Sequence, residues 1–592
     1  MRLSNQPSGL FAAATDEQLL RLGVPPALLP SVRAVRQEED LSQLLQWLPA
    51  ECVDSLILLA DGRSVEEVIN ELERQTPDAV DPTDVDQALD RIDSQAEFVV
   101  ITDDEALEAI LSAPMEQWRV FLHPTQKKLV RRGWNGPVRV LGGAGTGKTV
   151  VAMHRALWLA QQCIDHPEPG RSDRVLFTTY THNLATDIRG NLAKICTPQQ
   201  LQHIEVTHLD GWVGAYLRSQ GLTLRQFDRE ARAAAWTAAM VMAKPELNLP
   251  QGFYEEEWRE VVVPQACGTL EDYLAAKRLG RGTRLNALKR LHIWPVFDAL
   301  RSELRRRGLW EPEEAKQAAA DRLQAASAMP RYRSVVVDEA QDLDAASFRL
   351  IRALTGKEHA DDIFIVGDSH QRIYGRPLVL SQCGIQVRGR AKKLRINYRT
   401  TEETRAWASA VLRGLAFDDL DGGSDTSGDY RSLLHGDHPI LRGFEDPADE
   451  LAFLASHLRS IQQRDGGLSA TCVTCWSNEA VRVLVERFNL EGIATQEIKP
   501  DEADDPSNPA LRLATMQRVK GLEFDHIVIP NLSADLFPDP SLLNTCPDQV
   551  SRDNLEQRLR SLLHVAATRA RKQVLITYSG VPSPYLPKPK DS

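Results

Sequence analysis

The sequence has few cysteines and no long apolar run, and these two absences exclude several classes of protein. Its 592 residues include eight cysteines, which are too few and too irregularly spaced for a secreted disulfide framework. No stretch approaches the roughly 20 apolar residues that span a bilayer, and the first residues lack the apolar core of a signal peptide. We therefore expect a cytoplasmic protein with no membrane partner.

Aromatic residues are also sparse, at 6%, but the rest of the composition is ordinary for a folded protein. Apolar residues make up 42% of the chain and charged residues 26%, which excludes general disorder, collagen and coiled-coil rods. At roughly 100–200 residues per domain, the length predicts three to five domains.

Positive charge is in short supply overall, but the shortage is confined to one part of the chain. The net charge is −12, and residues 1–110 alone carry −16, with 23 Asp and Glu, seven Arg and no Lys. The remaining 482 residues carry 63 basic and 59 acidic groups, or +4, so a polyanion would meet a different field there. We expect residues 1–110 to form an acidic helical accessory region that binds a protein partner, or one that only caps the rest of the protein.

From about residue 116 onward, apolar strand-like runs alternate with helical patterns. These runs are VRVLGG, RVLFTTY, IEVTH, SVVVDEA, IFIVGD, KKLRINY, ATCVTCW, LRLATM, HIVIPNL and QVLITY. Such alternation favours βαβ units with buried parallel strands, and it is interrupted by a helix-rich stretch at 213–329. Cys472 and Cys475 lie in one of the runs without further ligands nearby, so we predict buried thiols and no zinc site.

The string VRVLGGAGTGKT at Val138–Thr149 carries the strongest chemical signal in the sequence. A strand runs into a glycine-rich turn whose backbone N–H groups can point inward at phosphates, and a helix follows. Lys148 would reach the β- and γ-phosphates, and the Thr149 hydroxyl would bind Mg²⁺. The predicted nucleotide-binding turn comprises Gly142, Gly143, Ala144, Gly145, Thr146, Gly147, Lys148 and Thr149.

A second motif, SVVVDEAQD, places two adjacent carboxylates at the end of a buried strand. Asp338 is placed to hold Mg²⁺, and Glu339 to orient and deprotonate an attacking water. The two motifs together indicate hydrolysis of ATP, with Mg²⁺ as the metal, rather than nucleotide storage.

At this point the chain resembles the UvrD/Rep-like superfamily 1 helicases, over about residues 118–580. The motifs occur in the family's order: FLHPTQKKLV, the P-loop, TTYTHNLA, VTHLD, DEAQD, GDSHQ, NYR, KGLEFD and VAATRA. The resemblance implies an α/β protein with two RecA-like P-loop domains with parallel sheets, an inserted helical subdomain and an α-helical N-terminal region. The expected boundaries are 1–110 for the N-terminal region, 116–212 with 330–396 for the first core, 213–329 for the insertion, 397–582 for the second core and 583–592 for a Pro-rich tail.

The resemblance also implies roles around the nucleotide, carried over by position. Gln126 would read the adenine edge, Tyr398 would stack on the base, and Glu523 would reach the ribose.

Three further residues take catalytic roles by the same resemblance. Gln371 would sense the γ-phosphate, and Arg399 and Arg569 would be arginine fingers from the second core domain. Their charge would stabilise the transition state only when the cleft closes, which would tie hydrolysis to domain movement.

The DNA track is expected to cross the tops of the two core domains. Tyr180 aligns with the family's stacking aromatic, with the alternative that it only closes the core, and the neighbouring DNA-facing positions are Thr179, His182, Thr207 and His208. Residues 277–307 contain ten Lys and Arg with Trp294 among them, which suits either phosphate contact or a solvated helix face.

The chain departs from the family pattern at several positions. The string Gly375-Arg376-Pro377 stands where a stacking aromatic is usual, Gln517 replaces a His, and His564 replaces a Tyr. Only 116 positions separate Arg399 from Thr515, where relatives insert a large rotating subdomain, so we expect that subdomain to be missing or vestigial.

The sequence therefore predicts an ATP-dependent DNA helicase or translocase that moves on single-stranded or partially duplex DNA, 3′ to 5′ by family resemblance. The first alternative is a translocase that displaces proteins or RNA polymerase with little unwinding. The second is an interaction module that only binds ATP.

Overall fold

The computed structural model describes residue 122 and residues 124–588 apart from gaps at 169–171, 223–227, 279–282, 327–330, 375–377, 426–429, 500–507 and 547, together with parts of 10–68. The chain divides into two compact units, Met1–Glu108 and Ala109–Ser592. The substitution at Gly375-Arg376-Pro377 lies outside the described residues.

The described part of the N-terminal unit is helical, with α1 at Asp16–Arg21 and α2 at Leu29–Ala34. Thr15 caps α1 and forms a capping box with Gln18, so two backbone donors at the start of the helix are satisfied. The unit has its own small core, whose buried members include Leu19, Val32 and Leu56.

The first core of the larger unit is a six-stranded parallel sheet in the order β3-β2-β4-β5-β1-β6. Its strands are β1 (Val138–Gly142), β2 (Val175–Thr179), β3 (Ile204–His208), β4 (Ser334–Val337), β5 (Ile363–Gly367) and β6 (Ala391–Leu394). One face of the sheet packs on α9 (Pro124–Arg131), α10 (Lys148–Asp165) and α11 (His182–Ile195), with α12 (Pro198–His203) beside them. The other face packs on α13 (Leu209–Ser219), α18 (Pro312–Ala325) and α19 (Ala345–Thr355). Helices on both faces explain why the central strands are continuous apolar runs.

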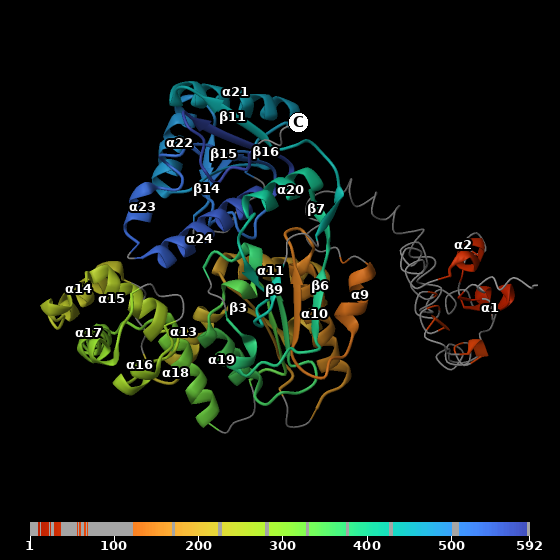
Figure 1. Cartoon of the computed structure of the whole chain (residues 1–592), viewed down its shortest axis with the longest axis horizontal. Coiled ribbons are helices and arrows are strands. Elements are labelled where there is room, and N and C mark those ends of the chain that lie inside the picture. Colours follow the sequence, from red (N-terminus) through yellow and green to blue (C-terminus); the bar gives the residue numbers. More distant parts are fainter. Residues whose placement is uncertain are drawn as a thin grey trace, which may run out of the picture. The chain divides into compact units, whose positions relative to one another are not determined.

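The second core is another six-stranded parallel sheet, in the order β11-β16-β15-β12-β14-β13. Its strands are β11 (Ile440–Phe444), β12 (Thr471–Cys475), β13 (Thr495–Glu497), β14 (Leu511–Thr515), β15 (Phe524–Ile529) and β16 (Ala570–Ser579). Figure 1 shows α21 (Pro447–Asp465) and α22 (Asn478–Leu490) beyond this sheet and α20 (Glu402–Val411) and α24 (Gln549–Ala567) between it and the first core. The short α23 (Pro540–Asn544) precedes α24. The α/β fold with two parallel sheets is thus confirmed.

A cluster of helices with its own core stands beside the first sheet (Figure 1). It consists of α14 (Arg229–Met240), α15 (Gln251–Glu257), α16 (Leu270–Ala275) and α17 (Ala287–Arg306). Trp236, Trp258 and Phe297 fill its centre. By contrast α13 and α18, which flank the cluster in sequence, contribute side chains to the core under the first sheet.

The run KKLRINY, which the sequence predicts as one strand, is divided between two sheets. Its first part is β6 of the first sheet, and its second part is β7 (Ile396–Thr401), which pairs in parallel with β10 (Arg431–Leu434). The chain turns away from β6 because β7 lies against the nucleotide-binding turn, where the Tyr398 N–H donates to the Gly145 carbonyl at 3.1 Å. A short hairpin of β8 (Phe417–Asp418) and β9 (Ser424–Asp425) lies between β7 and β10 in sequence.

Cys472 and Cys475 are both buried in β12, as predicted. Cys472 points into the core shared with α24 and Cys475 into the core on the opposite face, so one metal ion could not join them. Burial raises the pKa of the Cys475 thiol to about 12, which keeps it protonated. Among the described helices, none is long and apolar enough to cross a membrane.

Candidate active site

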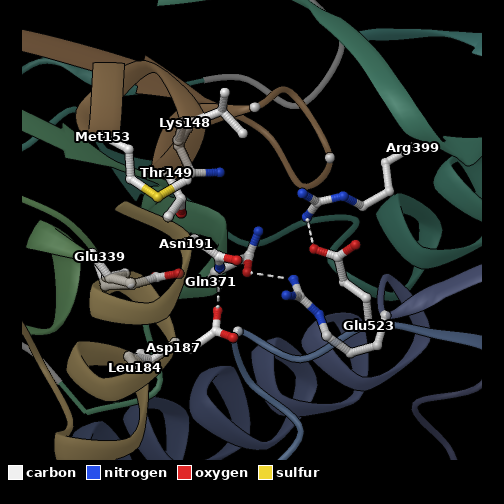
Figure 2. Close-up of a pocket in the computed structure, with 16 residues that line it drawn as sticks. Lys148, Thr149, Met153, Leu184, Asp187, Asn191, Glu339, Gln371, Arg399 and Glu523 are labelled. Carbon is white, nitrogen blue, oxygen red and sulfur yellow. Dashed lines mark hydrogen bonds and ion pairs between the residues drawn. The ribbon is translucent and has the colours of Figure 1, made fainter. Parts of the chain in front are cut away.

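A pocket opens where the carboxyl end of the first sheet meets the second core (Figure 2). Residues from both cores line it: Gly145, Gly147, Lys148, Thr149, Val150, Met153, Leu184, Asp187, Ile188, Asn191, Glu339, Gln371, Arg399, Gly521, Glu523 and Arg569. Nine of the predicted site residues are therefore brought together in one cleft.

The glycine-rich turn after β1 has the backbone that phosphate binding needs. Gly145 and Gly147 have φ values of 73° and 79°, which residues with a Cβ rarely adopt. Gly147 also precedes the first residue of α10, so the turn ends at the positive end of a helix dipole. The Thr146 hydroxyl donates to the Gly143 carbonyl at 2.9 Å and closes the turn.

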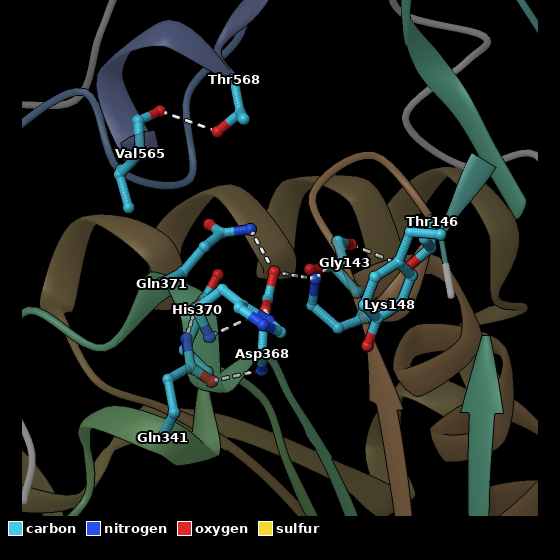
Figure 3. Close-up of polar contacts among 12 residues, drawn as sticks. Gly143, Thr146, Lys148, Gln341, Asp368, His370, Gln371, Val565 and Thr568 are labelled. Carbon is cyan, nitrogen blue, oxygen red and sulfur yellow. Dashed lines mark hydrogen bonds and ion pairs between the residues drawn. The ribbon is translucent and has the colours of Figure 1, made fainter. Parts of the chain in front are cut away.

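Lys148 is held inside this turn, where its ammonium can contact a bound phosphate. Its ammonium donates to the Gly143 carbonyl at 2.8 Å and lies 3.5 Å from Asp368. Gln371 donates to the same Asp368 carboxylate at 2.6 Å, and Figure 3 shows both side chains pointing at it. Burial alone would raise the pKa of Asp368, but Lys148 and His370 hold it well below its usual range. Lys148 and Gln371, the predicted phosphate-binding cation and the predicted phosphate sensor, thus both contact the Asp368 carboxylate.

Thr149 and Asp338 are adjacent, as a shared metal site requires. The Thr149 hydroxyl donates to the Asp338 carboxylate at 2.8 Å, at the end of β4. Burial and the neighbouring Glu339 raise the pKa of Asp338 to about 7. A hydroxyl and a carboxylate are oxygen ligands of the kind that Mg²⁺ prefers, so these two residues fit the metal.

Glu339 is in a strained backbone conformation beside three cations. Its φ of 53° is in the left-handed region, which a residue with a side chain adopts only when its surroundings enforce it. Burial acts to raise the pKa of its carboxyl, but Lys520, Lys148 and Arg569 lower it below the usual value. Glu339 is therefore ionised and able to accept a proton from water.

The two predicted arginine fingers both line the pocket. Arg399 on β7 pairs with Glu523 at 2.8 Å (Figure 2). Arg569, just before β16, donates to the Gln371 side-chain oxygen at 2.8 Å. Burial lowers the pKa of Arg569, while the negative charge of Glu339 opposes this shift. Both guanidinium groups thus lie in the cleft that holds the glycine-rich turn.

Gln126 and Tyr398, the predicted adenine contacts, both lie beside the same turn. The Gln126 amide donates to the Thr146 carbonyl at 2.9 Å, and the Tyr398 N–H donates to the Gly145 carbonyl. A base placed between them would be next to phosphates bound by the turn.

The residues predicted to face DNA gather at the ends of β2 and β3. Tyr180 stacks on Tyr374 with ring centroids 4.8 Å apart and planes inclined by 19°. His182 and His208 meet edge to face at 5.5 Å.

The two threonines of this predicted set have different surroundings. Thr207 is half-buried, and its hydroxyl donates to the His208 carbonyl at 3.3 Å. The Thr179 side chain is fully buried and does not reach this face.

The basic stretch at 277–307 divides into structural and exposed members. Arg278 is buried against Glu257 at 2.6 Å, and Arg301 pairs with Glu314 at 2.8 Å. Arg290 donates to carbonyls at the end of α16. Much of this positive charge therefore stabilises the helical cluster.

Sequence reasoning missed the role of Lys520 and the pairing partner of Tyr180. Lys520 lies in the KGLEFD motif of the second core, yet its ammonium contacts Asp342, lies 3.4 Å from Glu339 and donates to the Gln371 carbonyl at 2.8 Å. Tyr374 follows the GDSHQ motif and is 43% exposed. The motifs contained both residues, but only the folded chain shows what each one contacts.

Comparison with known proteins places the chain among helicases. The family model described as the UvrD/REP helicase N-terminal domain matches residues 122–376, and that described as the UvrD-like helicase C-terminal domain matches 493–580. The ATP-dependent DNA helicase PcrA of Leuconostoc citreum is 24% identical over 289 residues, which is 47% of this chain and 37% of PcrA.

Two other relatives match different shares of the chain. A probable DNA helicase of Mycoplasma pneumoniae is 23% identical over 76% of this chain and 82% of its own. The ATP-dependent DNA helicase UvrD2 of Mycobacterium tuberculosis is 29% identical over 40% of this chain and 35% of its own. The chain thus spans under two fifths of the length of PcrA and of UvrD2.

Proposed function

Since the chain belongs to the UvrD-like superfamily 1 helicases, we propose that it is an ATP-dependent DNA helicase that moves along single-stranded DNA, 3′ to 5′ as its family resemblance implies. One observation carries the proposal: a single pocket is lined by Lys148 and Glu339 from the first core and by Arg569 from the second. Because each core supplies part of the pocket, ATP turnover depends on how the cores are placed relative to each other.

The residues of the first core hold ATP and activate water. The glycine-rich turn and Lys148 bind the phosphates, and the ionised Glu339 accepts a proton from the attacking water. Mg²⁺ held by Thr149 and Asp338 would neutralise charge on the β- and γ-phosphates.

The residues of the second core complete the reaction and couple it to movement. Arg569 stabilises the charge that develops on the transferring phosphoryl group, and Gln371 connects it to the first core. Loss of the γ-phosphate removes the anion that both cores contact, so the cleft opens and the cores step along the strand.

The stacked tyrosine pair, of which Tyr374 is exposed and Tyr180 half-buried, supports single-stranded DNA as the polymer. Both tyrosines lie near the junction of the cores and near Arg558 of α24. Aromatic faces beside a cation suit bases and phosphates of a single strand.

A second function, displacement of proteins from DNA with little unwinding, is favoured by the second core. The described residues between Arg399 and Thr515, with gaps at 426–429 and 500–507, form parts of the second core, the β7–β10 pair and the β8–β9 hairpin rather than a second inserted helical cluster. A strand-displacement assay run beside a protein-displacement assay separates the two functions.

The proposal is tested by phosphate release with and without single-stranded DNA. We expect DNA to stimulate release and Lys148→Ala to lower it by at least about 100-fold. Undiminished turnover in Lys148→Ala would refute the site assignment. We further propose that the acidic residues 1–110 regulate the motor or bind a protein partner. The same assay on a chain lacking these residues tests whether they regulate the motor.

A further inference from the structure

The β8–β9 hairpin comes from the chain that follows β7, but it is fastened to the first core. Arg139 of β1 pairs with Asp419 at 2.9 Å, and Arg372 donates to Asp418 at 2.9 Å. Leu420 is fully buried in the core beneath the first sheet. Two ion pairs and an apolar anchor therefore fix the hairpin to the core that carries the glycine-rich turn.

The hairpin holds Tyr430 against that turn. The Tyr430 hydroxyl donates to Asp425 of β9 at 3.3 Å, and Lys393 lies over the Tyr430 ring at 4.8 Å while pairing with Asp425 at 2.6 Å. A Cβ built on Gly143 would lie 3.1 Å from the ring, so the ring occupies the space beside Gly143 that a side chain would need. The ring is 7% exposed and cannot move far.

Gly143 is the residue whose carbonyl organises the turn. It accepts hydrogen bonds from the Thr146 hydroxyl and from the Lys148 ammonium. Displacement of Gly143 would therefore change both the shape of the turn and the starting position of Lys148.

A second path connects the hairpin to the same turn. His370 lies between Asp425 at 3.6 Å and Asp368 at 3.4 Å, and its ring packs on Phe417 of β8 at 4.7 Å. Asp368 in turn lies 3.5 Å from Lys148. The hairpin is thus connected to the glycine-rich turn through Tyr430, which lies beside Gly143, and through His370 and Asp368, which lead to Lys148.

We propose that Tyr430, held by the β8–β9 hairpin, is a positioning residue that keeps the nucleotide-binding turn in its phosphate-binding shape before ATP arrives. A turn ordered in advance binds phosphate without an ordering cost, in the ground state and in the transition state alike. Loss of the brace therefore weakens nucleotide binding and raises KM while kcat stays nearly constant. The inference rests on the proposed ATP site and adds a residue outside the family motifs.

The test measures binding of a fluorescent ATP analogue to the full chain without DNA, beside steady-state ATPase kinetics with DNA. We expect Tyr430→Ala to raise the Kd and the KM about tenfold with kcat within twofold. Tyr430→Phe keeps the ring beneath Lys393 but loses the hydrogen bond to Asp425, so its Kd should rise less than that of Tyr430→Ala. Asp419→Ala loosens the hairpin at a half-exposed position outside the core and should raise Kd in the same direction by a smaller factor.

Tyr585→Ala is the matched control, because this tyrosine packs on Phe537 in the second core. Equal Kd values for Tyr430→Ala and the original chain, or equal weakening by Tyr585→Ala, would overturn the inference. Absence of DNA-stimulated hydrolysis in a chain that binds nucleotide contradicts the helicase proposal alone, whereas absence of nucleotide binding in the original chain contradicts both.

Discussion

The two cores have the same architecture, six parallel strands between helices, but their loops bring different sets of charged residues to the cleft. The first core supplies buried carboxylates, including Glu339, Asp342 and Asp368, which follow β4 and β5. The second core supplies Lys520 and Arg569, whose charged groups are buried among those carboxylates and Gln371. The fold therefore fixes where loops lie, and the residues on the loops decide which core holds the phosphates and which one responds to them.

Removing the second core's finger is the most severe way to break this division. We expect Arg569→Ala to lower kcat by at least about 10³-fold while nucleotide binding is retained, because the finger acts on transition-state charge. Phosphate release and binding of a fluorescent nucleotide measure the two quantities separately. Weakened binding with normal turnover would contradict the finger role. Arg571→Ala is the matched control, since Arg571 pairs with Asp525 at 3.9 Å and is not among the residues that line the pocket.

The sequence predicted the strands of the two parallel sheets better than it predicted the contacts between the cores. Runs with strong apolar character, such as VRVLGG and SVVVDEA, are strands of the first sheet as expected. The edge strands β11 and β13 were not predicted, because their residues are largely exposed or half-buried and show no apolar run.

Contacts between segments that are distant in the sequence could not be predicted from local sequence patterns. Lys520 was visible as part of a motif, but its approach to Asp342 depends on how two cores meet. Likewise, nothing near Tyr430 in sequence indicates that it lies on Gly143, which is about 290 positions away. Pairings of this kind are specified by the packing of whole elements rather than by residue spacing.

A buried histidine of the second core makes a contribution to stability that depends on pH. The His564 Nδ1–H on α24 donates to the Ala408 carbonyl at 3.0 Å, and the imidazole lies near Asp368, His370 and Arg569. Burial lowers its pKa from 6.5 to about 4, so between these values the unfolded chain binds more protons than the folded one. The neutral form of His564 thus stabilises the folded chain above about pH 6.5. This contribution to the free energy of unfolding, about 3 kcal/mol, is lost as the pH falls toward 4.

Thermal unfolding at a series of pH values measures this contribution. We expect His564→Gln to lose less stability than the original chain between pH 6.5 and 4, because glutamine has no proton to gain. His435→Gln is the control, since the His435 side chain is 72% exposed. Parallel curves for His564→Gln and the original chain would show that burial of His564 has no part in the acid response.

The smallest expected effects are on the affinity for single-stranded DNA, to which the first core contributes a stacking surface and the second core a cation. Tyr180→Ala removes a stacking surface from the first core and should weaken single-stranded DNA binding by about 1–3 kcal/mol, with Tyr180→Phe close to the original. Arg558→Ala removes a cation from the second core and should flatten the dependence of affinity on salt by about one counterion. Titrations of a labelled strand at several salt concentrations measure both. If Tyr180→Ala changed the salt slope and Arg558→Ala did not, the assignment of stacking to one core and phosphate contact to the other would be wrong.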